Sequence, residues 1–260
     1  MNLNLTGKVV VISGGAKGIG AAISLDCAQE GAIPVMLDRD SSALSQMEDK
    51  LSASGQRYGA FHCDLTDISQ CERAIQSAQE NFSKIDALVN NAGVNDGVGL
   101  EKGSPDRFVH SLQKNLIHYY ALAHFAFPAL KKSRGSIVNI ASKTAVTGQG
   151  STSGYVAAKG AILALTREWA VEFLPHHVRV NAVVPAEVMT PLYEQWLATF
   201  PNPQEKLASI VAKVPFDRRM TRAEEIASMV LYLLSGQASH ITGQHLYVDG
   251  GYVHLDRALS

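Results

Sequence analysis

The side chains best suited to proton transfer are Tyr155 and Lys159, which stand four residues apart. On the helix predicted for Ser153–Phe173, this spacing stacks both side chains on one face. A tyrosine titrates at about pH 10, too high for a base at neutral pH, and a nearby ammonium group lowers that pKa. Such pairs also occur by accident on helix surfaces. Two further polar residues, Ser142 after a predicted strand and Asn115 in the preceding long helix, therefore matter to the interpretation.

Near the start of the sequence, a glycine-rich loop lies between the predicted strand Lys8–Ser13 and the predicted helix Gly18–Glu30. Gly14 permits a tight turn, Gly18 lets the backbone approach a pyrophosphate, and Gly20 lets the helix pack against the strand. The N-terminus of that helix offers unpaired N–H groups and positive dipole to phosphates. This position between a buried strand and a helix predicts dinucleotide binding, where a glycine loop alone would be an ordinary turn.

The charges after the second predicted strand, Ile33–Leu37, bear on the choice of cofactor. Asp38 lies 18 residues beyond Gly20, where a carboxylate can accept both adenosine ribose hydroxyls and so favours NAD. A 2′-phosphate beside it would cost about 4 kcal/mol per charge pair at close range. Arg39 and Lys17 could offset that repulsion or be solvated surface charges. We expect NAD to be preferred and NADP to remain possible.

Short β-branched runs alternate with amphipathic stretches along the whole chain. The predicted strands are Lys8–Ser13, Ile33–Leu37, Arg57–Cys63, Asp86–Asn90, Ser136–Ile140, Val178–Val184 and Leu246–Val248. The predicted helices are Gly18–Glu30, Ser42–Ser54, Ile68–Phe82, Ser104–Ser133, Ser153–Phe173 and Arg222–Leu234. This alternation predicts one α/β domain, a doubly wound parallel sheet with helices on both faces and ligands at the carboxyl ends of the strands. Pro34 counts against the prediction of the second strand, because proline has no N–H group to donate to a neighbouring strand.

The composition narrows the classes of function and location. The 23 basic and 24 acidic residues leave a net charge of −1, without the basic excess of a nucleic-acid-binding protein. No secretory signal and no apolar run long enough for a bilayer are evident. The scattered cysteines Cys27, Cys63 and Cys71 suit a reducing compartment, so we expect a cytoplasmic protein. The nine histidines lack metal-ligand spacing, and we expect no metal site.

Taken together, the motifs resemble the short-chain dehydrogenase/reductase family from Leu5 to about Tyr252. The resemblance rests on the glycine loop, Cys63 to Leu65, Asn90 to Gly93, Asn115, Ser142, Tyr155, Lys159 and the pair Val180 and Asn181. It implies a seven-stranded Rossmann-type fold and an NAD(P)-dependent oxidoreductase. Two positions depart from the family pattern: Ala186 replaces the usual glycine after Pro185, and Ser13 replaces a threonine while keeping its hydroxyl.

The resemblance also implies roles for residues. Ser142 would hold the substrate oxygen, Tyr155 would transfer the proton, Lys159 would hold the nicotinamide ribose and lower the tyrosine pKa, and Asn115 would anchor a water in a proton relay. Asp64 and Leu65 would contact adenine. The expected cofactor-binding residues are Gly14, Lys17, Gly18, Ile19, Asp38, Arg39, Asp64, Leu65, Asn91, Ala92, Gly93, Tyr155, Lys159, Pro185, Val188 and Thr190.

The loops after the strands carry several groups that could bind a polar substrate. Asn95, Gln149 and Glu187 can hydrogen-bond hydroxyl groups, and Trp196 could stack on a sugar ring. The stretches from Gly93 to Gly97 and from Ala186 to Leu192 look like those of the bacterial L-fucose dehydrogenase branch of the family. We therefore expect a free sugar as substrate, with L-fucose first. Each residue also has a plainer interpretation, as a turn, a solvated charge or a residue that packs on its own helix.

Other functions remain open at this point. A 3-oxoacyl-carrier reductase would favour a basic entrance and NADP, and a hydroxysteroid dehydrogenase would favour an apolar substrate loop. A dinucleotide-sensing regulator without turnover would generally lack the Tyr155 and Lys159 pair, which this chain keeps. The apolar faces of Tyr155–Phe173 and Ile226–Leu234, together with family analogy, predict a homotetramer unless both faces are buried against the sheet.

Overall fold

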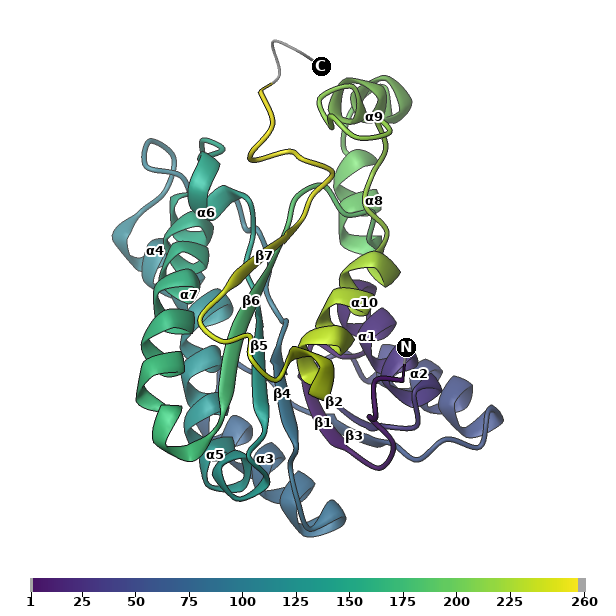
Figure 1. The fold of residues 1–260 in the computed structure, drawn as a ribbon. Helices are drawn as coiled ribbons and strands as arrows, with labels where there is room; N and C mark the ends of the chain where they lie inside the picture. Colours follow the sequence, from purple (N-terminus) through teal and green to yellow (C-terminus); the bar gives the residue numbers. More distant parts are fainter. Residues whose placement is uncertain (1, 257–260) are drawn as a thin grey trace.

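The computed structural model describes residues 2–256 and contains the expected seven-stranded parallel sheet (Figure 1). The strand order is β3-β2-β1-β4-β5-β6-β7, and neighbouring strands pair in parallel throughout. The strands are β1 (Val9–Ser13), β2 (Ile33–Asp38), β3 (Gly59–His62), β4 (Ala87–Asn90), β5 (Ser136–Ile140), β6 (Arg179–Pro185) and β7 (His245–Val248). The prediction of a doubly wound Rossmann-type sheet is confirmed.

Helices cover both faces of the sheet, which is why β1 and β5 consist entirely of buried residues. On one face, α3 (Ile68–Phe82), α5 (His118–Ser133) and α7 (Ser153–Glu172) pack over a core that includes Leu88, Ile137 and Val180. On the other, α1 (Gly18–Gln29) and α10 (Ala223–Leu234) pack against each other and over Ile12 and Val183. The helix α2 (Ser41–Ala53) covers the end of the sheet at β2 and β3.

Pro34 lies inside β2 without breaking it. The N–H of Ile33 donates to the Lys8 carbonyl on the β1 side, so the nitrogen of Pro34 faces the opposite side, toward β3. Pairing with β3 begins one residue later, between Val35 and Gly59. The missing donor of Pro34 therefore removes no hydrogen bond from either ladder.

The helix predicted over Ser104–Ser133 is divided into three parts. It begins as α4 (Pro105–Leu112), continues as a π-helical segment over Gln113–Ile117, and ends as α5. Pro128 lies inside α5 and does not end it. The wider turn of the π segment matters because it contains Asn115, and such segments are often found at functional sites.

Within residues 2–256, three α-helices are additional to those predicted: α6 (Thr144–Thr147), α8 (Pro191–Leu197) and α9 (Pro203–Val211). The last two stand beyond the carboxyl ends of β6 and β7, close to the C-terminal segment (Figure 1). Because all strands run parallel, the loops after β1, β2, β4, β5 and β6 open at the same edge of the sheet. Within residues 2–256, no helix combines the length and apolar character needed to cross a bilayer.

Candidate active site

Ser142 and Tyr155 meet at the carboxyl end of β5. Ser142 is buried, and its hydroxyl accepts a 3.0 Å hydrogen bond from the hydroxyl of Thr144. Tyr155 is the third residue of α7, and its phenol interacts with the Ser142 hydroxyl. Two groups 13 positions apart in the sequence are thus brought together by the strand end and the start of the next long helix.

Lys159 lies one turn further along α7 and is 2 % exposed. Its ammonium group donates to the Tyr119 hydroxyl at 3.0 Å and to the Ile140 carbonyl at 2.7 Å, and it lies 5.6 Å from the centre of the Tyr155 ring. Sequence reasoning did not single out Tyr119, which is fully buried on α5 and donates to the same carbonyl. The lysine is therefore held in place by the protein chain itself.

In the protein chain without cofactor, burial shifts the pKa values of both Tyr155 and Lys159. Burial raises the pKa of Tyr155, and the hydrogen bond with Ser142 opposes that shift. Burial also lowers the pKa of Lys159 to about 7, because the ammonium form loses hydration. The Lys159 ammonium is directed to Tyr119 and Ile140 and is itself disfavoured by burial, so the expected lowering of the Tyr155 pKa stays a prediction for the site with cofactor bound.

The π-helical segment places Asn115 at the centre of the site. Its Oδ1 accepts a 2.7 Å hydrogen bond from the Val94 N–H, and its Nδ2 donates to the Ser111 carbonyl at 2.9 Å. A Cβ atom on Gly93 would lie 3.0 Å from the Asn115 Oδ1 and 3.4 Å from the Lys159 Nζ. The absence of a side chain at Gly93 therefore leaves space beside both polar groups.

The glycine loop is tied to the end of β4. The Asn91 side chain donates to the carbonyls of Ser13 and Gly14 at 3.0 and 3.1 Å, and the N–H groups of Asn91 and Ala92 donate to the Ser13 hydroxyl. Serine thus supplies the hydroxyl that this position needs. A Cβ atom on Gly20 would collide with the Gly14 carbonyl oxygen, so close packing of α1 against the loop requires glycine there.

The N-terminus of α1 is suited to an anion. Its N-cap residue, Lys17, makes no side-chain cap, and the first turn contains no acidic residue. The first N–H groups of α1, which include that of Ile19, are therefore left without a side-chain partner. Gly18 has φ +54°, and a Cβ there would contact the Thr190 side chain at 3.3 Å. Thr190 thus lies against the loop from the far side of the site.

Asp38 ends β2 beside this loop and is buried. Its Oδ2 accepts from the Ala16 N–H at 3.2 Å, and its Oδ1 accepts from the Asp40 N–H at 3.1 Å. Lys17 donates to Asp40 at 2.6 Å, and exposed Arg39 interacts with the Asp64 carboxylate. Of the two cations that could attract a 2′-phosphate, Lys17 therefore already has a carboxylate partner, and the charge of Arg39 acts on Asp64. Asp40 was missed in the sequence, although it also forms the N-cap of α2.

The other expected cofactor residues lie at the same edge of the sheet. The Asp64 carboxylate accepts from the backbone and hydroxyl of Thr66, which lowers its pKa, and Leu65 packs partly buried behind it. Pro185 ends β6 and accepts the Lys143 N–H at 2.9 Å, while buried Val188 forms a β-bridge with Thr221.

The residues expected to bind substrate differ from one another in their exposure and contacts. Asn95 is exposed, and its Oδ1 accepts from the Gly97 N–H at 3.3 Å, as in a simple turn. Gln149 is exposed in the loop between α6 and α7. Trp196 is 42 % exposed on α8, and its ring packs edge-on against Tyr193 and Phe200. For Asn95 and Trp196, these contacts match the plainer interpretations as a turn residue and a residue packed on its own helix.

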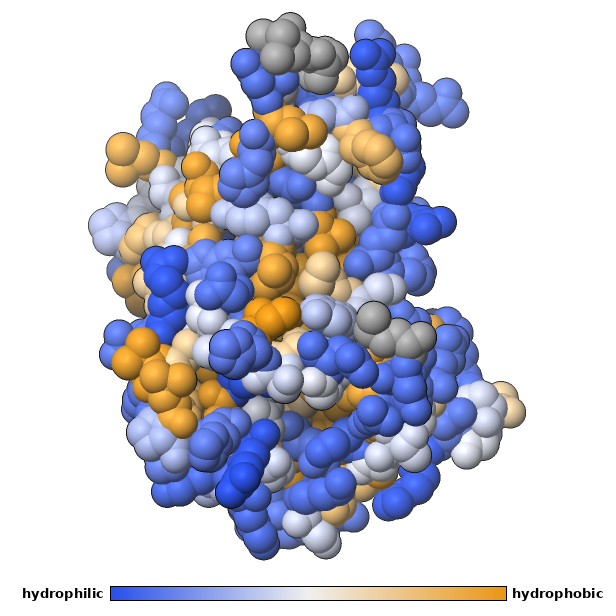
Figure 2. Space-filling view, viewed as in Figure 1, coloured by the Kyte–Doolittle hydropathy of each residue, from blue (hydrophilic) through white to orange (hydrophobic). Residues whose placement is uncertain are grey.

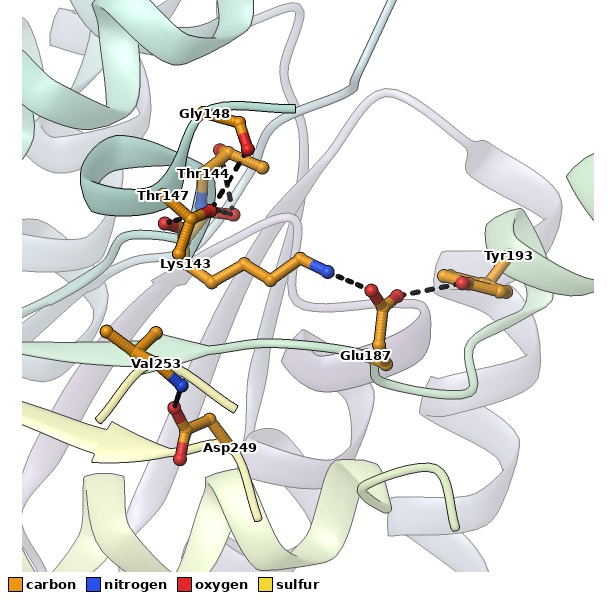
Figure 3. Close-up of polar contacts among 9 residues, drawn as sticks. Lys143, Thr144, Thr147, Gly148, Glu187, Tyr193, Asp249 and Val253 are labelled. Carbon is orange, nitrogen blue, oxygen red and sulfur yellow. Dashed lines mark hydrogen bonds and ion pairs between the residues drawn. The ribbon is translucent and has the colours of Figure 1, made fainter. Parts of the chain in front are cut away.

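Glu187 was expected to bind a substrate hydroxyl or, more plainly, to be a solvated charge, and it has two close partners in the protein. It forms an ion pair with Lys143, and its other oxygen accepts a 2.8 Å hydrogen bond from the Tyr193 hydroxyl (Figure 3). The Lys143 ammonium also lies 3.8 Å from the centre of the Tyr252 ring. Sequence reasoning missed Lys143, although it directly follows Ser142 and so stands at the strand end where ligands bind.

No group of three or more His, Cys, Asp or Glu side chains in the described part of the chain is arranged to hold a metal ion. The candidate site therefore consists of a hydroxyl pair, a buried lysine, a loop of glycines and backbone N–H groups, and one ion pair. That set can bind a dinucleotide and exchange a proton with an alcohol or carbonyl oxygen.

Comparison with known proteins gives the family. Residues 14–253 match the family model described as enoyl-(acyl carrier protein) reductase. The chain is 36 % identical over 247 residues to the L-fucose dehydrogenase of Mus musculus, covering 95 % of this chain and 88 % of the other. It is 47 % identical to a crystal structure of Cj0485 dehydrogenase, with TM-score 0.95 and coverage of 100 % and 99 %.

A third similarity is to the ligand-free structure of Thermoplasma acidophilum aldohexose dehydrogenase, at 32 % identity and TM-score 0.89, covering 99 % and 98 % of the two chains. The structural matches extend over nearly the whole length of both partners, so they concern the whole fold. From these matches and the geometry above, the chain belongs to the short-chain dehydrogenase/reductase family and is an NAD(P)-dependent dehydrogenase.

Proposed function

We propose that the protein oxidises a free sugar, with L-fucose as the first choice, at the anomeric carbon to give the lactone. The observation that carries the proposal is the polar cluster of Lys143, Glu187 and Tyr193 beside Ser142, which offers charged donors and acceptors to hydroxyl groups. These groups already pair with one another, but an ammonium group can donate three hydrogen bonds and a carboxylate can accept about four. A sugar hydroxyl could use the remaining capacity, which a steroid or acyl chain could not. The similarity to proteins named L-fucose dehydrogenase and aldohexose dehydrogenase supports the same substrate class.

The residues present fit a nicotinamide dinucleotide. The uncapped start of α1 with Gly14, Gly18 and Ile19 would hold the pyrophosphate, and Asp38 the adenosine ribose. We assign adenine to Asp64 and Leu65, and the nicotinamide half to Asn91, Ala92, Gly93, Pro185, Val188 and Thr190. When bound, the oxidised cofactor supplies the hydride acceptor and a positive charge.

In the proposed reaction, Ser142 holds the anomeric oxygen and Tyr155 takes its proton while hydride leaves C1, so that the C1–O bond becomes a carbonyl. Burial opposes the phenolate form of Tyr155, so the positive charge at the nicotinamide is needed to offset it. Lys159 would bind the nicotinamide ribose. Its pKa of about 7 suits it to passing the proton onward at neutral pH, toward a water held near Asn115.

We infer that NAD is the preferred cofactor. Asp38 points its carboxylate into the loop that would surround the adenosine ribose, and a 2′-phosphate would meet its charge. Lys17 could neutralise that phosphate only by leaving Asp40, and the charge of Arg39 also acts on the Asp64 carboxylate. The same two residues allow weaker NADP binding.

We also propose a homotetramer, although one of the two apolar faces predicted from the sequence to lie in subunit contacts is buried within the chain. The apolar residues of α10, such as Ile226, Val230 and Leu233, are fully buried, as the plainer interpretation held. Exposed apolar side chains instead occur on α4, α5, α7 and the neighbouring segments: Val109, Ile117, Tyr120, Val171 and Leu174. Figure 2 shows hydrophobic surface over the lower part of α7.

The test of the proposed function is NAD reduction with L-fucose, D-arabinose and L-galactose, which share ring stereochemistry, beside a steroid alcohol and a 3-hydroxyacyl thioester. We expect turnover of the sugars alone. Turnover of either apolar substrate with no activity on any of the three sugars would refute the proposal and favour the 3-oxoacyl or hydroxysteroid alternative.

A further inference from the structure

The ion pair between Lys143 and Glu187 joins two loops of the active site. Lys143 directly follows Ser142, and its backbone N–H donates to the Pro185 carbonyl at 2.9 Å, which holds the loop after β5 against the end of β6. The Lys143 side chain then extends to the carboxylate of Glu187 on the loop after β6 (Figure 3). Lys143 is thus one position from Ser142 in the sequence, and Glu187 is two positions from Pro185.

Neighbouring elements fix this pair in position. The Tyr193 hydroxyl, from α8, donates to the second oxygen of Glu187 at 2.8 Å. The ring of Tyr252 lies under the Lys143 ammonium at 3.8 Å. Tyr252 is placed by a turn in which Asp249 accepts the N–H groups of Gly251 and Val253 at 2.8 and 2.9 Å.

The pair is largely removed from water, with side-chain exposures of 11 % for Lys143 and 13 % for Glu187. Opposite charges that are taken out of water compensate each other, and removal of one leaves the other uncompensated. An ammonium group can donate three hydrogen bonds and a carboxylate can accept about four, so the contacts described above leave capacity for a ligand. The pair thus presents donors and acceptors side by side without net charge.

We propose that Lys143 and Glu187 together determine substrate specificity, selecting neutral vicinal diols of a sugar over acidic and amino sugars. This inference rests on the proposed sugar dehydrogenase function. One hydroxyl accepts from the Lys143 ammonium while its neighbour donates to Glu187. An anionic ligand would gain at Lys143 and lose at Glu187, and a cationic ligand would do the reverse, so neither gains over a neutral diol.

Removal of either charge should change the preference in a direction set by the charge that remains. In E187Q, unpaired Lys143 should raise kcat/KM for L-galacturonate, which carries a carboxylate in place of the 6-methyl group, relative to L-fucose by about tenfold or more. In K143M, unpaired Glu187 should instead raise the value for L-fucosamine, a cationic amino sugar, relative to L-fucose. Opposite responses cannot come from general damage to the site.

A matched control is E225Q, which removes a carboxylate from the ion pair with Arg219 at the start of α10. Its substrate ratios should equal those of the wild type, and NAD binding with a thermal melt shows that each variant is folded. If the wild-type enzyme oxidises L-fucose but both ratios stay unchanged in E187Q and K143M, this inference is wrong and the proposed function stands. If the wild-type enzyme oxidises no neutral sugar, both are wrong.

Discussion

The ammonium group of Lys159 donates a 3.0 Å hydrogen bond to the hydroxyl of Tyr119, and both groups also donate to the carbonyl of Ile140. All of these groups are buried. The base of the active site is thus a preformed polar network, in which a hydroxyl and a carbonyl oxygen hold the lysine. Its charge is disfavoured, which makes it responsive to pH near neutrality.

The buried lysine should make stability depend on pH. The pKa of Lys159 falls from 10.5 to about 7 on burial, so between these values the unfolded chain binds more protons than the folded chain. The free energy of unfolding therefore rises with pH across this window, and K159M should remove that part of the rise. Urea unfolding at pH 7 and pH 9.5 measures it for both proteins. If the free energy of unfolding changes equally between the two pH values in the wild type and in K159M, burial does not disfavour the charge of Lys159.

Loss of the Tyr155 hydroxyl should separate chemistry from binding. Phenylalanine keeps the ring but cannot accept or give a proton, and acid/base groups contribute about 10²- to 10⁴-fold in rate. We expect Y155F to lose turnover while its NAD affinity stays within a few-fold, as measured by quenching of intrinsic fluorescence. A variant with near-normal kcat would exclude Tyr155 from proton transfer.

Cofactor preference should respond to the carboxylate that holds Lys17. In D40N, Lys17 loses its partner, so the ratio of kcat/KM for NADP to that for NAD should rise several-fold. D38S should raise the ratio further, because it removes the charge that would face the phosphate. D49N, an exposed substitution further along α2, serves as the control. A wild-type preference for NADP would show that the cations outweigh Asp38.

The exposed apolar side chains of α5 and α7 should lie in a subunit interface. Light scattering at micromolar concentration is expected to give the mass of a tetramer for the wild type and a smaller mass for the double variant Y120E/V171E. L192E, which also changes an exposed apolar residue but on α8, is expected to keep the tetramer. A monomeric wild type would contradict the proposed assembly.

Much of the fold could be predicted because its signals are local. A buried β-branched run marks β1, and glycines mark the loop after it. The helical period of apolar residues and an N-cap residue mark α3. Two missed helices had readable signals as well: Thr190 before Pro191 and Asn202 before Pro203 are N-cap residues followed by proline at the first helical position. Nothing local marks the π segment around Asn115, since it depends on how α4 and α5 pack.

The site shows the same division. Ser142, Tyr155, Lys159 and Asn115 could be found because family motifs fix their spacing. The partners that set their electrostatics could not, because Tyr119 reaches Lys159 across 40 residues and Lys143 reaches Glu187 across 44. Such pairs depend on strand order, which places the ends of β5 and β6 side by side.

The most direct test of the central claim uses L-fucose with deuterium at C1 and NAD as acceptor. If the enzyme oxidises the anomeric carbon, the deuterium is transferred to C4 of the nicotinamide, the reduced cofactor gains one mass unit, and the sugar product is the unlabelled lactone. Mass spectrometry of both products measures the transfer. Reduced cofactor without deuterium would place the oxidation at another carbon, and no reduction of NAD would contradict the sugar assignment itself.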